Sequence, residues 1–123
     1  MEGTLFFRAC LPATGCGLWK SDGTEAGTVL VATIDPAGLS GLQFLTPVGA
    51  TVFFAVDDGA TGRELWKSDG TAAGTVRVKD IQAGGSSDPQ DLVNVNGTLF
   101  FTADDAVTGR ELWKSDGTAA GTV

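Results

Sequence analysis

The sequence predicts an all-β chain of tandem four-stranded antiparallel sheets, and three observations lead to this fold class. A motif ending in Ser-Asp-Gly-Thr occurs three times at a constant interval of 47 residues. The segments between the turns are rich in β-branched and aromatic residues, which favour strands. No window of the sequence carries a helical i, i+3, i+4, i+7 apolar pattern of useful length.

The repeat fills the chain. Its three octamers begin at Gly17, Glu64 and Glu111. Residues 48–76 and 95–123 align without a gap and share 22 identical residues of 29. Such self-similarity is the signature of a repeat architecture. We therefore expect one array of about 2.6 units, with these bounds: 1–47 as the first unit, 48–94 as the second, and 95–123 as a truncated third.

Four strands are expected in each unit. In chain order the clearest examples are 63–68, 75–81, 92–95 and 98–103, where apolar, aromatic and β-branched residues gather. Turn-forming compositions separate them: the Asp-Gly-Thr segment, 84–89 and 104–109. Four short strands in each unit correspond to one blade of a β-propeller.

Stacked blades also explain the aromatic residues. Blades lie face to face, so a central strand is buried on both sides. We therefore expect each double Phe to place one ring on either face of its blade: Phe6-Phe7, Phe53-Phe54 and Phe100-Phe101. One Trp in each unit is expected to fill the gap between blades, with stacking on a ligand as the alternative: Trp19, Trp66 and Trp113.

The number of repeats limits how the chain can close. Propellers have about four to eight blades, and a single unit cannot bury its own faces. The third unit stops at Val123, which aligns with Val29 at the start of the last strand of the first unit. We expect either a fragment of a longer array or a homo-oligomer that completes a ring. A chain that stays open would expose sheet edges and faces, which is an aggregation hazard.

The octamer Glu-Leu-Trp-Lys-Ser-Asp-Gly-Thr, with Asp-Asp-x-x-x-Gly-Arg before it and Ala-Ala-Gly-Thr-Val after it, resembles the ELWxxDGT repeat family over essentially the whole chain. The resemblance implies a propeller-like fold and a secreted or surface-attached bacterial protein, and it implies no known activity. The first copy departs from the family pattern, because Gly17 replaces Glu and because Cys10 and Cys16 are not typical.

The Ser-Asp-Gly-Thr segment is also similar to the aspartate-box turn of sialidase-type propellers, which ties a hairpin together away from the catalytic centre. In the second unit we expect Asp69 to bind backbone N–H groups of its own turn, Gly70 to adopt a positive φ, and Thr71 to add a hydroxyl contact. Asp22 and Asp116 take the same structural role. A sialidase activity is disfavoured, because the chain has no tyrosine to act as the nucleophile.

The two cysteines occupy places that hold an Asp–Arg pair in the other copies. Cys10 and Cys16 flank a five-residue hairpin loop, so they should face each other across two strands. We expect a disulfide worth about 2 kcal/mol, and hence an oxidising compartment. Reduced thiols and a metal or redox pair are the alternatives. In the other copies we expect ion pairs: Asp57–Arg63 and Asp104–Arg110.

Paired carboxylates open two of the hairpin loops, as Asp57-Asp58 and Asp104-Asp105. Together with loop carbonyls they can bind Ca²⁺, which prefers six to eight oxygen ligands. The alternative is purely conformational, since Asp and Gly favour such loops. The first copy has Leu11 at the second of these places, so we expect no calcium site there.

Composition excludes several classes of function. The net charge is −7, from 15 acidic and 8 basic residues, which disfavours nucleic-acid binding. The absence of histidine excludes histidine catalysis and His-containing zinc sites. The longest apolar stretch, 29–34, is far shorter than the roughly 20 residues that span a bilayer. We expect no membrane insertion and no signal segment within this chain.

Repeated carboxylates argue against an enzyme. Glu64 and Glu111 recur at equivalent strand positions, whereas acid–base catalysis needs two carboxylates in one pocket with opposed pKa values. We expect a non-enzymatic scaffold or interaction module without a cofactor, located outside the cell or at its surface. Its partners would be further copies of itself, glycans or extracellular proteins. A lectin-like multivalent glycan-binding propeller is the alternative, and a glycosidase-type enzyme is the third candidate.

Overall fold

A computed structural model describes residues 4–11, 15–35, 42–57, 62–82 and 85–123, with only the backbone described at 10, 11, 15, 16 and 33–35. These residues form ten strands and no helix. The first sheet contains β1 (Leu5–Leu11), β2 (Gly15–Ser21) and β3 (Val29–Asp35). The second contains β4 (Gln43–Val48), β5 (Thr51–Asp57), β6 (Arg63–Ser68) and β7 (Val76–Lys79). The third contains β8 (Gln90–Val95), β9 (Thr98–Asp104) and β10 (Arg110–Ser115).

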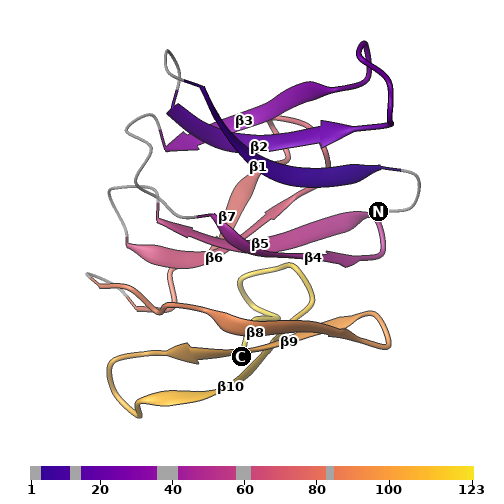
Figure 1. Cartoon of the computed structure of the whole chain (residues 1–123). Helices are drawn as coiled ribbons and strands as arrows, with labels where there is room; N and C mark the ends of the chain where they lie inside the picture. Colours follow the sequence, from indigo (N-terminus) through magenta and orange to yellow (C-terminus); the bar gives the residue numbers. More distant parts are fainter. Residues whose placement is uncertain (1–3, 12–14, 36–41, 58–61, 83–84) are drawn as a thin grey trace.

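The all-β prediction is confirmed. Every sheet is antiparallel and is built from strands consecutive in the chain. The strand predicted at 63–68 has the observed bounds, whereas the one predicted at 75–81 is confined to β7. Figure 1 shows the three sheets lying one upon another in chain order. The described residues do not close a ring, so the propeller arrangement stays a prediction.

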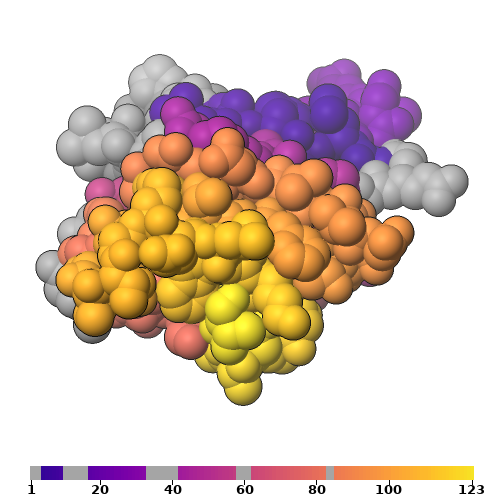
Figure 2. All heavy atoms as spheres, turned by 90° about the horizontal axis from the view of Figure 1, so that it is seen from below, coloured from indigo at the N-terminus to yellow at the C-terminus, as the bar shows by residue number. Residues whose placement is uncertain are grey.

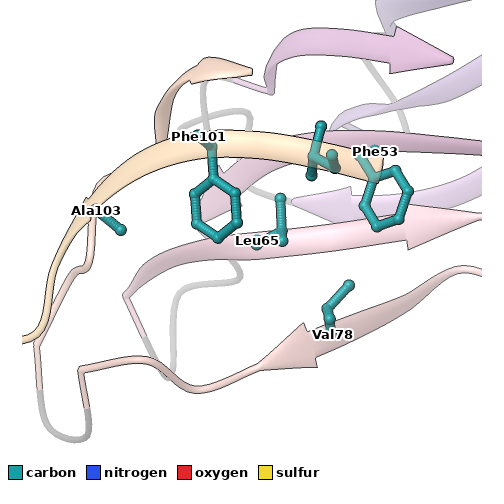
Figure 3. Close-up of a cluster of buried hydrophobic side chains, with 6 residues drawn as sticks. Phe53, Leu65, Val78, Phe101 and Ala103 are labelled. Carbon is teal, nitrogen blue, oxygen red and sulfur yellow. The ribbon is translucent and has the colours of Figure 1, made fainter. Parts of the chain in front are cut away.

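The second sheet is buried on both faces by its neighbours. Side chains alternate across a strand, so Phe53 and Phe54 of β5 point to opposite sides. Phe53 packs with Leu65 and Val78 against the third sheet, as Figure 3 shows. Phe54 packs in the cluster shared with the first sheet. The double Phe is therefore explained by burial on two sides.

Two of the three sheets have three strands in the described part of the chain, whereas the second has four. Among the described residues β1 pairs only with β2, whereas β5, its equivalent 47 residues later, pairs with both β4 and β6. In the third sheet β10 pairs with β9 on one side. On its other side the amide of Lys114 donates to the carbonyl of Val123 at 2.8 Å, and the reverse bond is 3.0 Å. Lys67 and Val76 are paired in the same way at the start of β7.

Candidate functional site

Three turns with the same hydrogen bonds follow β2, β6 and β10. In the turn after β6, the Oδ1 atom of Asp69 accepts from the amide of Thr71 at 2.9 Å and from its hydroxyl at 2.6 Å. Gly70 lies between them at φ 94°, in the left-handed region that favours glycine. The turns at Asp22 and Asp116 repeat these bonds.

Hydroxyl groups complete each turn. The Thr75 hydroxyl donates to the carbonyl of Thr71 at 2.7 Å and lies 2.7 Å from the Ser68 hydroxyl. Ser68 in turn accepts from the amide of Gly70 at 3.0 Å. A Cβ atom at Gly74 would overlap the Asp69 carboxylate, so this position requires glycine. The repeated motif therefore has a local structural role in joining β6 to β7.

The turn aspartates are held in the ionised form. The hydroxyl and the amide of Thr71 lower the pKa of Asp69, because both donate to its charged carboxylate. Lys20 adds to this lowering as a smaller cause. For Asp116 the same bonds from its own turn lower the pKa, with Lys67 as a further cause. For Asp22 the lowering comes from its own turn alone.

Lysines join each sheet to the turn of the next sheet. Lys20 on β2 donates to the carbonyl of Gly70 at 3.0 Å. Lys67 on β6 donates to the carbonyl of Gly117 at 2.6 Å. The direction is the same in both cases, from the earlier sheet to the later one. Lys114 is the equivalent residue on β10, and it is exposed with no described residue in hydrogen-bonding reach of its ammonium group.

Glu64 anchors the segment that leads from the second sheet to the third. It is fully buried, and its carboxylate accepts from the amides of Ile81 and Ser87 at 2.7 and 3.0 Å and from the Ser87 hydroxyl at 2.9 Å. Burial raises the pKa of Glu64, and these hydrogen bonds oppose the rise without cancelling it. Glu111, the equivalent residue on β10, is exposed. The two glutamates do not lie in one pocket as an acid–base pair would.

Asp88 forms ion pairs with two arginines, which are the first residues of β6 and β10. Arg63 forms an ion pair with it at 3.4 Å, and Arg110 forms another at 3.4 Å. The backbone register does place Asp57 opposite Arg63 and Asp104 opposite Arg110, as the 47-residue spacing predicts.

The predicted Asp104–Arg110 ion pair is not formed. The Oδ1 atom of Asp104 accepts from the amide of Ala106 at 2.7 Å, and the ion pair of Arg110 is the one with Asp88. Arg110 therefore pairs with Asp88 in the segment before β8, and not with Asp104 on the neighbouring strand β9 as the sequence predicts.

The carboxylate of Asp105, in the loop between β9 and β10, accepts hydrogen bonds from the backbone of its own loop. Asp105 accepts from the amides of Val107 and Thr108 at 2.9 and 2.8 Å, and these bonds lower its pKa. Asp58 lies outside the described residues, and Asp57 ends β5. Among the residues that the structure describes, no group of three or more His, Cys, Asp or Glu could hold a metal ion. Calcium binding stays a prediction.

The cysteine positions pair across the first hairpin. The register of β1 and β2 places Cys10 opposite Cys16. Their side chains lie outside the described part of the chain, so the disulfide stays a prediction. Titration of free thiols in the denatured protein, with and without prior reduction, would test it.

The three tryptophans occupy equivalent places on their sheets but have different surroundings. Trp66 packs against the cluster between the first and second sheets, and Trp113 packs against the cluster between the second and third. Trp19 stacks on Phe7 with ring centroids 6.4 Å apart. Leu18 belongs to the cluster shared with the second sheet, so alternation places Trp19 on the opposite, outer face of the first sheet.

Two cavities adjoin β1. One of about 310 Å³ lies between successive turns and is lined by Phe6, Lys20, Asp22, Asp69 and Gly70, among others. A second, of about 210 Å³, is mainly apolar and is lined by residues of β1, β4 and β5: Leu5, Phe6, Leu45, Pro47 and Val52. The first combines carboxylates, an ammonium group and an aromatic ring, a set that can bind polyhydroxylated molecules.

The sequence predicts exposed sheet faces in a chain that stays open, but this prediction does not identify the residues on the two outer faces of the stack. The outer face of the third sheet, which is turned toward the viewer in Figure 2, carries Leu112 with 70% of its surface exposed. On the first sheet, Leu5 is 63% exposed. The 47-residue offset makes Leu112 equivalent to Leu65 and Leu5 equivalent to Val52. In the second sheet these equivalents are 0% and 2% exposed, so the same positions are buried where a neighbouring sheet covers them.

Comparisons of the chain with family models, with curated proteins and with solved structures gave no match. The resemblance to the ELWxxDGT repeat family therefore stays a prediction from the sequence. No helix long and apolar enough to cross a membrane occurs among the described residues.

Proposed function

We propose that this chain is a non-enzymatic β-propeller scaffold or interaction module of an extracellular repeat protein, and that isolated copies assemble into a closed ring. The observation that carries the proposal is the packing of the second sheet. It has four antiparallel strands and lies between two other sheets, with a phenylalanine buried on each face. Face-to-face packing of four-stranded sheets is how propeller blades are arranged.

The recurring polar residues support a structural role. Asp22, Asp69 and Asp116 are engaged in hydrogen bonds of their own turns. Glu64 is engaged by backbone amides of the segment between β7 and β8. Groups with these partners stabilise the fold, and acid–base chemistry would instead require a carboxylate directed at a substrate.

The shape of the assembled particle tests the proposal. Electron microscopy of the purified chain should show closed rings of uniform size. Single open particles or irregular aggregates at every protein concentration would overturn the self-assembling ring. An oxidising, extracellular location is part of the proposal, and reduced thiols at Cys10 and Cys16 in protein purified under non-reducing conditions would argue against it.

Glycan binding is the second candidate function, and the cavity of about 310 Å³ favours it. Asp22 and Asp69 can accept hydrogen bonds from sugar hydroxyls, and Phe6 offers an aromatic surface. A glycan array with the assembled protein tests this candidate. Glycan binding that is lost in Phe6→Leu, in a variant of unchanged solution mass, would establish a lectin. If no glycan on the array binds, the non-enzymatic scaffold is the one candidate function that is kept.

A further inference from the structure

The two outer faces of the stack resemble the two halves of an interface that the chain already forms twice. We call the outer surface of the third sheet, with Phe100, Leu112 and Lys114, the leading face. We call the outer surface of the first sheet, with Leu5, Phe7 and Trp19, the trailing face. They lie on opposite ends of the stack, as Figure 1 shows from the order of the sheets.

Within the chain, the same pattern makes each contact between sheets. The earlier sheet contributes a phenylalanine and a leucine, as Phe53 and Leu65 do toward the third sheet. The later sheet contributes side chains from the opposite face of the equivalent strand, as Phe101 and Ala103 of β9 do. The contact between the first and second sheets uses Phe6 and Leu18 on one side, and on the other side Phe54 and Val56.

The leading face carries the first half of this pattern without a partner. Phe100 and Leu112 stand 47 residues after Phe53 and Leu65. Leu112 is 70% exposed, whereas Leu65 and Leu18 are both fully buried.

The trailing face carries the second half. Leu5 and Phe7 stand 47 residues before Val52 and Phe54. Leu5 is 63% exposed, whereas Val52 is 2% exposed. Large exposed apolar residues that cluster on one surface mark an interaction site.

The hydrogen bond from a lysine to a turn glycine, which joins neighbouring sheets within the chain, has an equivalent donor on the leading face and an equivalent acceptor in the turn after β2. Lys114 has no described acceptor for its ammonium group, and its equivalents Lys20 and Lys67 each reach the turn glycine of the next sheet. Gly23 has the same φ of 94° as Gly70 and Gly117, so its turn presents a carbonyl of the same kind. Asp22 beside it carries a negative charge that complements Lys114.

We propose that the leading face of one copy docks on the trailing face of a second copy, with Lys114 donating to the carbonyl of Gly23 of the partner subunit. The inference rests on the proposed ring and specifies how it closes. Two copies joined head to tail at both ends provide six sheets, which lies within the range of about four to eight blades found in propellers. The contact is heterologous, because each copy supplies one face of each kind, and it gives a closed dimer when it rotates one copy by half a turn relative to the other.

The new contact is smaller than the two within the chain. Among the described residues, the third sheet has no strand in the place of β7, whose Val78 belongs to the contact between the second and third sheets. The described part of the first sheet has no strand beside β1 in the place of β4. Because less apolar area is buried, we expect the dimer to dissociate on dilution while each three-sheet stack stays folded.

Two complementary variants test the geometry. Leu112→Asp places a charge on the leading face alone, and Leu5→Asp places one on the trailing face alone. Each variant by itself should be monomeric in light scattering, and an equimolar mixture should form a dimer, because one intact face of each kind remains. The matched control is Val107→Asp, since Val107 is 86% exposed in a loop away from both faces and its change should leave the wild-type mass unaltered.

Other outcomes would overturn the docking geometry. If either variant alone stays dimeric, the copies meet through a different surface, and the assembling scaffold survives without this interface. If the mixture stays monomeric although near-ultraviolet circular dichroism shows both variants folded, the head-to-tail contact is wrong. A wild-type chain that is monomeric at every concentration would overturn the proposed ring itself.

The lysine contact has its own test. Lys114→Met removes the ammonium group and keeps the aliphatic stem, and we expect the dissociation constant of the dimer to rise about tenfold, as for the loss of a charged hydrogen bond. Arg77→Met, which removes an exposed cation from β7, is the control and should leave the constant unchanged. Equal constants for wild type and the Lys114 variant would show that the lysine does not make the contact.

Discussion

The strands β6 and β10 share the sequence Arg-Glu-Leu-Trp-Lys-Ser but differ in almost every environment. In β6 the glutamate, the leucine and the serine are buried, whereas in β10 only the serine is buried. The difference arises from what lies beyond each strand. The second sheet is covered by the third, and no described residue covers the outer face of the third. Identical local sequence thus gives different burial, because burial is a property of the stack.

The largest expected effect concerns the two leucines of this shared sequence. Leu65→Ala should lower the free energy of unfolding by about 2–5 kcal/mol, because it leaves a cavity between two sheets. Leu112→Ala should change it by less than about 0.5 kcal/mol in the dissociated chain, because that side chain is in water. Urea unfolding of both variants at low protein concentration makes the comparison. Equal losses would contradict the stacking of the second and third sheets.

The glutamates of the same sequence should differ next. Glu64→Gln should cost about 1–3 kcal/mol at neutral pH, because the amide group turns a donor toward the N–H groups of Ile81 and Ser87. Glu111→Gln should have almost no effect, because Glu111 is exposed. Thermal unfolding of the pair at pH 7 measures the difference. A loss of similar size in both variants would show that the buried carboxylate is not the cause.

The pH dependence of the wild type sharpens this comparison. The pKa of Glu64 is raised in the fold, so the native state binds more protons than the unfolded chain between the ordinary pKa of glutamate and the raised one. The contribution of this group is therefore fully present below the ordinary pKa and is lost as the pH rises through the raised value. Glu64→Gln should remove this part of the pH profile and Glu111→Gln should keep it. An unchanged profile in Glu64→Gln would contradict the assignment.

The smallest difference is expected for the arginines that share Asp88. The Arg63 side chain is 16% exposed and that of Arg110 is 37% exposed. Exposed ion pairs contribute about 0–1 kcal/mol, so Arg63→Ala should cost about 1 kcal/mol and Arg110→Ala less than that. Added salt should widen the difference between the two costs, because it screens the more exposed pair of Arg110 most and so lowers the smaller cost further. Calorimetric unfolding at two salt concentrations checks both statements, and a larger cost for Arg110→Ala would reverse the inferred order.

The sequence predicts most of the strands because their signals are local. β9 follows from its Thr and Phe residues, and β6 follows from Leu65 and Trp66 between two turn-forming segments. The register of β5 on β6 follows from the five-residue loop between Asp57 and Arg63. The bonds of Asp69 within its turn are what Asx-turn chemistry leads one to expect.

Contacts between sheets could not be predicted in the same way. Lys67 meets Gly117 only because two sheets stack at a particular angle, and nothing near either residue encodes that angle. Asp88 forms an ion pair with Arg110 because the segment before β8 lies against the end of β9, where the amide of Asp104 donates to the carbonyl of Ser87 at 2.9 Å, and the register alone does not reveal this contact. Glu64 is a buried anchor for the same reason, since its partners come from the segment after β7.

The most direct test of the account is the solution mass of the wild-type chain by light scattering after size exclusion, measured at several concentrations with EDTA alongside. The account predicts a defined dimer that dissociates into folded monomers on dilution and is unaffected by EDTA. Loss of the dimer in EDTA would instead assign a calcium-binding role to the loop aspartates such as Asp105. A monomer at every concentration, or a polydisperse aggregate, would contradict the claim that the two outer faces are halves of one interface.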